Sequence, residues 1–476
     1  MIYFLFISPA VFGLFTLVIP SDRYRPYLIP VACITQCILA FMNLRSPVSS
    51  FSRWIGLDPF GSIVLVIITF LFLLLSFYIV GYLDFRRERK NRYFCLSVLF
   101  LLGMLNLSIV SQHLGLMWIA MESATLSAVP LVYFNKREES LEAVWKYMLI
   151  GGVGIAIALM GSFFLVYSAF VESENSTLIY SELLASSNYY SKFWIRVAFV
   201  FLFVGYGTKI GLVPMHTWKP DVYGESSGAI GALLAGGVIT CAFLALLRVV
   251  HIVNMAGEGP YARSLLIFTG IISMALASIF MLDQRDFKRL LAYSSIEHMG
   301  ILVLGIGIGG PALSATFLHM INNSLTKGVM FLSAGNLHRA CKSKSIESVK
   351  GMVHVLPFSA IMFIIGFLAI TGSPPFGPFL SEFLLTKAFF ESGNNLVGVV
   401  FLILLFIVFL GMGRTVFYVV FGHPSLKRNE IAPSESLLTT IPILLLALTV
   451  LALGIFIPDQ IKVMLNDAVK FYGEFR

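Results

Sequence analysis

Apolar runs long enough to cross a lipid bilayer follow one another along almost the whole chain. A helix that spans the hydrocarbon core needs about 20 apolar residues, and a helix pairs its backbone polar groups within one segment. The runs occupy residues 2–19, 27–43, 60–83, 93–110, 113–134, 144–170, 193–217, 226–251, 264–282, 290–308, 311–336, 353–390, 396–421 and 437–457. Charged residues make up 12% of the sequence, about half of their share in a soluble domain. The sequence therefore predicts an all-α polytopic membrane protein with about fourteen transmembrane helices.

Several chemical functions are excluded by motifs that the sequence lacks. Its five cysteines form neither a CxxC pair nor a Cys/His cluster with metal-ligand spacing, so we expect no metal and no cofactor in this chain. We find no P-loop, no dinucleotide-binding glycine motif and no nucleophile–His–Asp arrangement. The net charge of +8 is typical of the basic loops of a membrane protein, so nucleic acid is not expected as a partner. The first run lacks a basic n-region and is expected to be retained as a span.

Basic loop residues predict the orientation of the chain. They are concentrated after the odd-numbered runs, at Arg86, Arg87, Arg89, Lys90, Arg92, Lys136, Arg137, Arg285, Lys288, Arg289, Arg339, Lys342, Lys344 and Lys350. The even loop near 171–192 instead carries Glu172, Glu174 and Glu182. Because basic loops stay in the cytoplasm, both termini are predicted to lie outside.

Glycine and proline interrupt two of the runs. The run 193–217 contains Gly205, Gly207, Gly211 and Pro214, and the run 353–390 contains Gly372, Pro374, Pro375, Gly377 and Pro378. Proline removes a backbone hydrogen bond, and glycine leaves room for other groups to satisfy the freed carbonyls. We therefore expect two broken helices, with breaks at Pro214 and at Pro374 and Pro375.

Buried charges recur at a similar spacing in the two halves. Glu122 and Lys209 are separated by about 87 positions, and Glu297 and Glu382 by about 85. Paired broken helices in matching places are typical of inverted-repeat transporters. We predict two inverted five-helix repeats, at 93–252 and 263–422, between an N-terminal three-helix segment, 1–92, and a C-terminal helix and tail, 423–476. The alternative is that these features are scattered by chance.

Glu122 and Lys209 are the first candidates for chemistry. A lysine at the centre of a bilayer costs about 2.5–3.5 kcal/mol on insertion scales, so it is kept where it has a partner or a hydrated route. Glu122 is the nearest candidate partner. Such a pair is a switch, because a proton added to one group changes the affinity of the other. The alternative is a static salt bridge that locks two helices.

Further ionisable groups lie in the second half. His298 is favoured as a relay because its ordinary pKa is near neutral, and Glu297 faces another helix or a headgroup, although the two roles could be reversed. His319, Asn323 and Lys327 share one helix face at i, i+4 and i+8, and could order a file of water. Glu382 lies inside its apolar run, whereas Lys387 is nearer the end and could reach an interface.

Other charged residues are expected to be structural. Lys146 opens its run and is expected to extend toward the interface. Arg248 and His251 end the run 226–251 and are expected to be interfacial, and Asp58 to cap the helix that follows it.

These segments resemble the antiporter-like proton-pumping subunits of respiratory complex I, Mrp-type antiporters and membrane-bound hydrogenases. The similar stretches lie within about residues 55–425 and include MESATL, TKIGLVPMHTWKPD, DFKRLLAYSSIEHMG, HMINNSLTKGVMFLSAG and GSPPFGPFLSEF. Within this superfamily the chain is most similar to component F of hydrogenase 4, of the formate-hydrogenlyase group. Complex I subunits of the M type share most of these motifs.

The resemblance implies roles for particular residues. Glu122 and Lys209 would be an input pair and Glu382 the terminal residue facing outside, with His298, His319 and Lys327 on the axis between them. Complex I relatives often carry a lysine where this chain has Thr240, which orients water but holds no charge.

The implied protein is a proton-translocating subunit of a multi-subunit oxidoreductase in a prokaryotic cell membrane. Its implied partners are other membrane subunits and a peripheral redox module of the hydrogenase or NADH dehydrogenase type. The alternatives are an M-type complex I subunit, an Mrp-like Na⁺/H⁺ antiporter subunit and a structural anchor.

Overall fold

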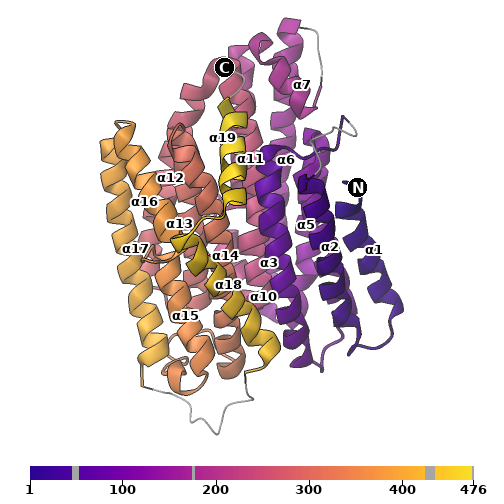
Figure 1. The fold of residues 1–476 in the computed structure, drawn as a ribbon, viewed down its shortest axis with the longest axis vertical. Coiled ribbons are helices and arrows are strands. Elements are labelled where there is room, and N and C mark those ends of the chain that lie inside the picture. The colour runs from indigo at the N-terminus through magenta and orange to yellow at the C-terminus, as the bar shows by residue number, and fades with distance from the viewer. Residues whose placement is uncertain (46–52, 174–176, 424–434, 474–476) are drawn as a thin grey trace.

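The computed structural model describes residues 1–45, 53–173, 177–423 and 435–473, and these residues are almost entirely helical. The long helices run roughly along one axis, side by side, as Figure 1 shows. Glu174 lies outside the described residues, and so does the side chain of Glu172. The α-helices are α1 (Phe4–Val18), α2 (Leu28–Arg45), α3 (Pro59–Asp84), α4 (Arg92–Val110), α5 (Leu114–Val132), α6 (Glu138–Ser173), α7 (Tyr180–Ala185), α8 (Lys192–Ile210), α9 (Trp218–Glu225), α10 (Gly228–Leu233), α11 (Ile239–Val253), α12 (Gly259–Leu282), α13 (Phe287–Ile308), α14 (Ala312–Cys341), α15 (Pro357–Ile370), α16 (Gly377–Glu391), α17 (Asn395–Phe421), α18 (Leu437–Ile455) and α19 (Asp459–Gly473).

The predicted fold class is confirmed. Within the described residues, 10 helices are long and apolar enough to cross a membrane, and α1 and α15 are shorter apolar helices. One of the ten is the stretch 228–282, in which a π-helical segment joins α10 to α11 and a kink at Gly257 (φ 80°) separates α11 from α12. The number of fourteen crossings and the two inverted repeats stay predictions.

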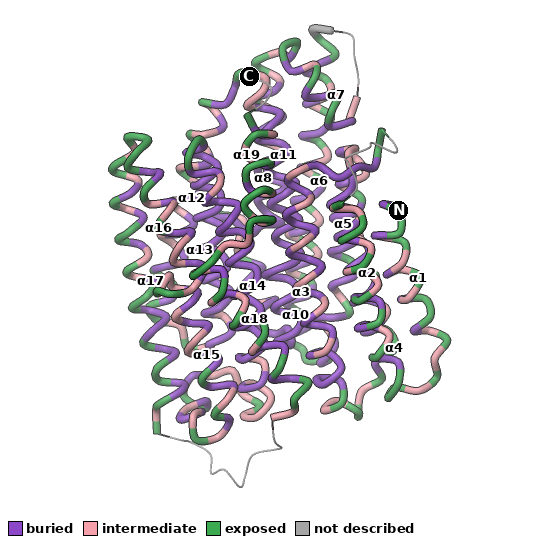
Figure 2. Tube along the Cα trace, viewed as in Figure 1, coloured by how far each residue is buried: buried purple, intermediate pink, exposed green. Residues whose placement is uncertain are grey.

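The interior is formed by helices that are buried on all sides. Every residue of α13 except Arg289 is buried, although this helix carries Ser294, Glu297 and His298. Figure 2 shows buried residues through the middle of the bundle, with exposed residues on outer helices such as α1 and α17. A polar helix in this position must pair its side chains with neighbouring helices, because it touches neither lipid nor water.

Small residues bring α6 and α8 into close contact. A Cβ added to Gly154 would lie 2.6 Å from Thr208 Cβ, and one added to Gly205 would lie 2.6 Å from Ala158 Cβ. Glycine on a helix face lets two backbones approach, which is how membrane helices gain packing without a hydrophobic driving force between them. This contact fixes α8, and therefore Lys209, against its neighbours.

Both predicted breaks are present. The helix α8 ends at Ile210, and α9 begins at Trp218, after a loop of seven residues that contains Pro214. The second break separates α15 from α16 and contains Pro374 and Pro375. Gly211 (φ 75°), directly after α8, and Gly372 (φ 66°), two residues after α15, adopt the left-handed region, which glycine does without steric cost.

One C-terminal element differs from the prediction. The sequence predicts a single helix and a tail after residue 423, but in the structure α18 is followed by a second helix, α19. Its residues Phe471 and Tyr472 pack on Phe60 and His251, with ring centroids 5.1 Å (Phe60–Phe471) and 5.3 Å (His251–Tyr472) apart. The helix α19 is not predicted because its polar residues interrupt any apolar run of spanning length.

The ends of the chain lie toward one end of the bundle. Figure 1 places the C-terminus and α7 at the upper end, and the N-terminus at the upper end of α1. Glu182 lies on α7. A hydrogen bond from the Thr177 hydroxyl and an ion pair with Arg53 hold the pKa of the Glu182 carboxyl below its ordinary value. The side of the membrane on which this end lies stays a prediction.

Candidate functional site

Glu122 of α5 and Lys209 of α8 form the ion pair that the sequence predicts. Lys209 Nζ donates to Glu122 Oε2 at 2.9 Å and to Thr125 Oγ1 at 2.6 Å. Gly151 of α6 leaves space for the ammonium group, because a Cβ at this position would lie 3.2 Å from Nζ. Lys209 is buried, whereas the Glu122 side chain is 25% exposed. The pair therefore joins the outer surface of the bundle to its interior.

The break after Lys209 is held by side-chain and backbone hydrogen bonds. Trp218 Nε1 donates to Thr208 O at 2.9 Å, and the Val213 amide donates to Ser273 Oγ at 3.1 Å. Since freed backbone groups in lipid need internal partners, these contacts stabilise the interrupted helix. They fix Lys209 at the end of a helix whose last carbonyls face the break.

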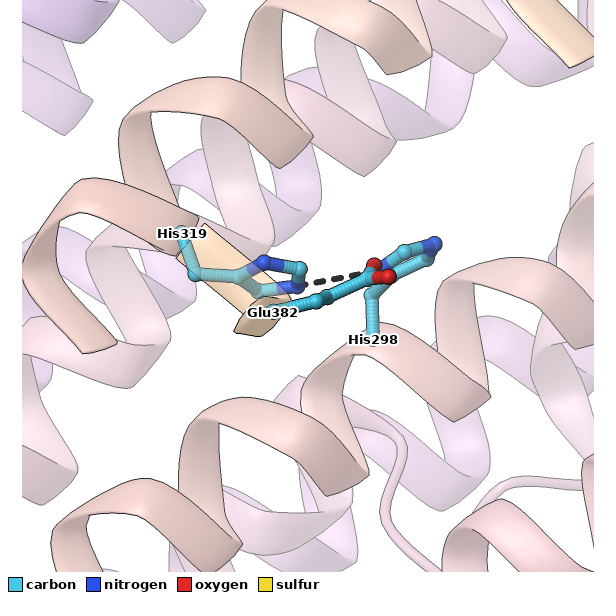
Figure 3. A group of neighbouring side chains, drawn as sticks. All are labelled: His298, His319 and Glu382. Atoms are coloured by element: carbon cyan, nitrogen blue, oxygen red, sulfur yellow. Dashed lines mark hydrogen bonds between the residues drawn. The ribbon is translucent and has the colours of Figure 1, made fainter. Parts of the chain in front are cut away.

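His298 and His319 meet at the contact between α13 and α14. His298 Nδ1 and His319 Nε2 are 3.0 Å apart, and the rings are stacked with centroids 5.1 Å apart. His319 Nδ1 lies 3.0 Å from Ser381 Oγ on α16. Figure 3 shows the two rings facing each other with the Glu382 carboxylate beside them. A neutral imidazole has one donor and one acceptor nitrogen, so the linked rings can pass a proton in either direction.

The same three side chains have metal-ligand chemistry. One potential ligand atom from each of His298, His319 and Glu382 lies within 4.8 Å of the others, and all three residues are buried. The sequence predicts no metal here, and the two imidazoles are already joined by a hydrogen bond. Ligation through these two nitrogens would break that bond, so the observed geometry fits proton transfer better than metal binding.

Lys327 of α14 and Glu297 of α13 extend this group of side chains inside the bundle. Lys327 Nζ donates to Ser294 Oγ at 2.6 Å. Glu297 Oε2 lies 3.9 Å from His298 Nε2, and Glu297 is buried. The option that Glu297 faces a headgroup is therefore wrong, because α13 is enclosed by other helices along its length.

The remaining predicted residues differ in their placement. Thr240 Oγ1 donates to Gly236 O at 2.8 Å and lies 3.0 Å from Ser324 Oγ. Asn323 is buried, and its amide group has no hydrogen-bond partner among the described residues. Lys387 is exposed and pairs with Glu391 at 3.6 Å, so the structure does not bring it to the interior group.

Two interfacial assignments from the sequence are wrong. Arg248 is buried and lies 2.7 Å from Asp58 Oδ2, while also donating to backbone carbonyls that include Ile109 O at 2.7 Å. His251 is buried, with Nδ1 2.6 Å from the Tyr180 hydroxyl. Both residues end an apolar run, but α7, α19 and the chain that links α4 to α5 cover this end. Asp58 caps α3 as predicted, accepting from the Gly61 amide at 2.6 Å.

Lys146 is also paired with acidic residues. Its Nζ lies 2.6 Å from Glu142 and 2.7 Å from Asp221. The sequence predicts only a side chain that extends toward the interface. The contact with Asp221 is missed because it arises from the packing of α9 on α6, which spacing along the chain does not show.

Lys219 is a buried lysine that is not among the candidates predicted from the sequence. It lies in the first turn of α9, and its Nζ is 3.4 Å from both the carbonyl oxygen and the hydroxyl of Ser295. The available signal is its place in the same motif as Lys209, TKIGLVPMHTWKPD. Because this residue follows the break, its side chain is buried by contacts with Gly211 and α13 and not by an apolar run of its own.

The fold and the buried ionisable groups together define a class: polytopic membrane proteins with protonatable side chains through the interior. Residues 111–407 match the family described as NADH:quinone oxidoreductase/Mrp antiporter, TM. The chain belongs to this family. A relative described as a hydrogenase-4 component F homolog, from Methylacidiphilum infernorum (isolate V4), is 36% identical over 367 residues, covering 76% of this chain and 75% of the relative.

Solved structures share the fold. A chain of the membrane-bound sulfane sulfur reductase, an archaeal respiratory membrane complex, matches with a TM-score of 0.89 and 21% identity, covering 100% of this chain and 98% of that chain. A chain of the Mrp complex from Dietzia sp. matches with a TM-score of 0.86 and 17% identity, covering 99% and 97%. At these identities the likeness concerns the fold alone.

Proposed function

We propose that this chain is a proton-translocating membrane subunit of a multi-subunit oxidoreductase complex. The observation that supports it best is the series of buried ionisable groups across the bundle. It begins at the Glu122–Lys209 pair and includes Lys327, the His298–His319 pair and Glu382. Ionisable side chains inside membrane proteins are costly and mark ion routes. The family relationship and the hydrogenase-4 component F relative support the same function.

The chemistry of these groups favours protons over sodium. Hard cations are bound by several oxygen ligands. In the middle of the bundle the Lys327 amine and the His298 and His319 imidazoles lie among the Glu297 and Glu382 carboxylates, so nitrogen groups occupy the space that further oxygen ligands would need. Such nitrogen groups bind and release protons. A proton route therefore fits this interior better than the alternative of a sodium site of the Mrp antiporter type.

The coupling step starts at Glu122. Its carboxylate is partly exposed on the bundle surface, where a neighbouring membrane subunit could change the local charge. Weakening of the pair with Lys209 would change the proton affinity of the lysine, because the two titrations are coupled. Protons would then shift toward Lys327, the histidine pair and Glu382 by stepwise electrostatic repulsion. Electron transfer in a peripheral redox module would supply this change of charge near Glu122. The module would be of the hydrogenase type, or of the NADH dehydrogenase type if the chain is an M-type complex I subunit.

The experiment uses the complex purified through a tag on this chain and reconstituted into vesicles. A potassium diffusion potential drives proton uptake, which an internal pH dye reports. We expect Glu122→Gln and Lys209→Met each to lower the rate by at least about tenfold, since a positioned proton-transfer group contributes about 10²–10⁴. The exposed Lys462→Met serves as the control.

Three outcomes distinguish the alternatives. Wild-type rates in both Glu122→Gln and Lys209→Met would reject proton translocation along this axis and favour a structural anchor. A rate that requires external sodium would favour an antiporter. Loss in both variants, without a sodium requirement, is the expected result.

A further inference from the structure

Lys219 lies just beyond the break that follows Lys209. Its aliphatic stem crosses the break at Gly211, where an added Cβ would lie 2.5 Å from Lys219 Cδ. A left-handed glycine is therefore required here for two reasons, the turn itself and the passage of the lysine stem. The side chain is fully buried, and its ammonium end reaches α13.

The contacts of Lys219 Nζ are too long to hold a permanent charge in place. Both of its contacts, to the carbonyl and the hydroxyl of Ser295, are 3.4 Å long, beyond the usual range for N–H···O bonds. By contrast, buried Lys288 donates to Gly224 O at 2.8 Å and also to Ser226 O. Lys288 has the contacts of a structural lysine, whereas Lys219 has those of a group whose protonation can change.

Adjacent residues of α13 contact two different lysines. Ser295 contacts Lys219, and Ser294 accepts from Lys327 Nζ at 2.6 Å. The hydroxyl of Thr240 donates to Gly236 O and lies 3.0 Å from Ser324 Oγ, and it holds no charge. Lys219 therefore places a second titratable amine against α13, one residue from the serine that Lys327 contacts.

We propose that Lys219 is the relay group that carries protons between Lys209 and Lys327. The inference rests on the proposed function. The Lys219 ammonium gives one proton to the Ser295 hydroxyl, and through Ser294 and water ordered there one proton reaches the neutral Lys327 amine. Lys219 is then a neutral amine and takes a proton from the Lys209 side. Because Lys219 and Lys327 contact adjacent residues of α13, their two ammonium charges repel each other in the low-dielectric interior, so the charge moves from one to the next.

The test compares three lysine variants in the vesicle assay described above. Lys219→Met removes the amine and keeps the aliphatic stem over Gly211, and Lys219→Arg keeps a charge that does not leave at any working pH. We expect each to lower proton uptake by at least about tenfold. Lys288→Met is the control matched for burial, and we expect it to retain uptake within about twofold per molecule incorporated.

The results separate this inference from the proposed function. Wild-type uptake in either Lys219 variant, together with loss in Lys209→Met, would overturn the role of Lys219 and leave the function standing. Wild-type uptake in Lys209→Met would instead overturn the function itself. If Lys219→Met fails to incorporate, Lys219→Arg decides, because a purely structural cation would be replaced by arginine and uptake would persist.

Discussion

Arg248 and Lys209 each form an ion pair in the interior, and the surroundings of the two pairs differ. Arg248 contacts Asp58 and several backbone carbonyls, among them Ile109 O and Ser111 O. Lys209 has two side-chain partners, Glu122 and Thr125. An arginine stays charged under all working conditions, whereas a buried lysine changes its protonation readily. The Arg248 pair is therefore structural, and the Lys209 pair is suited to switching.

This difference predicts separable effects of substitution. Arg248→Leu leaves Asp58 buried without its cation and should cost about 3–5 kcal/mol of stability, seen as a lower thermal unfolding midpoint in detergent. Proton uptake per folded molecule should stay within about twofold of wild type. Arg87→Gln, which removes an exposed pair with Asp84, should leave the midpoint unchanged. A stable Arg248→Leu protein without proton uptake would contradict the structural role.

The sequence predicts some residue contacts and misses others for physical reasons. Glu122 and Lys209 are predicted to pair because charges inside apolar runs need partners. The contact between His298 and His319 is not predicted, since the relative rotation of α13 and α14 does not follow from hydropathy. Arg248 is wrongly predicted to be interfacial because the segments that bury it come from distant parts of the chain. Lys219 is missed for the same reason, since its contacts come from another helix.

At the scale of elements, the second break positions Glu382. Gly372 has a φ of 66°, and a Cβ on it would lie 2.0 Å from Glu382 Oε2. The glycine therefore permits the backbone turn and gives the carboxylate its space. Proline and glycine in the sequence predict this break, but not which carboxylate lies against it.

Alanine at two glycines should have opposite effects on stability. Gly372→Ala is strained by its backbone angle and displaces Glu382, so we expect a loss of more than about 1 kcal/mol and slower proton uptake. Gly152 lies within α6 with open space around it, so Gly152→Ala should stabilise by about 0.5–1 kcal/mol. Unfolding of both variants in detergent measures the difference. Equal stability of Gly372→Ala and Gly152→Ala would contradict this expectation, because it would show that position 372 tolerates a Cβ atom.

At the scale of the whole molecule, charge and shape agree on two distinct ends. The sequence places basic loops after the odd-numbered runs and acidic residues in the loop near α7, and both termini lie toward the α7 end in Figure 1. The class of fold follows from the apolar runs alone. The α7, α9 and α19 helices do not, because short or amphipathic helices at the ends of a bundle lack a spanning signal.

The orientation can be tested with two introduced cysteines. Tyr189 lies just after α7 and is 60% exposed, and the exposed Arg87 lies in the loop after α3, at the opposite end. In a variant without the half-buried Cys37 and Cys341, a membrane-impermeant maleimide applied to intact cells should label Tyr189→Cys. It should label Arg87→Cys only after the membrane is opened, because basic loops are retained in the cytoplasm. The reverse labelling pattern would place both termini in the cytoplasm and turn Glu382 toward the cytoplasm. It would then invert the direction of the proposed proton route.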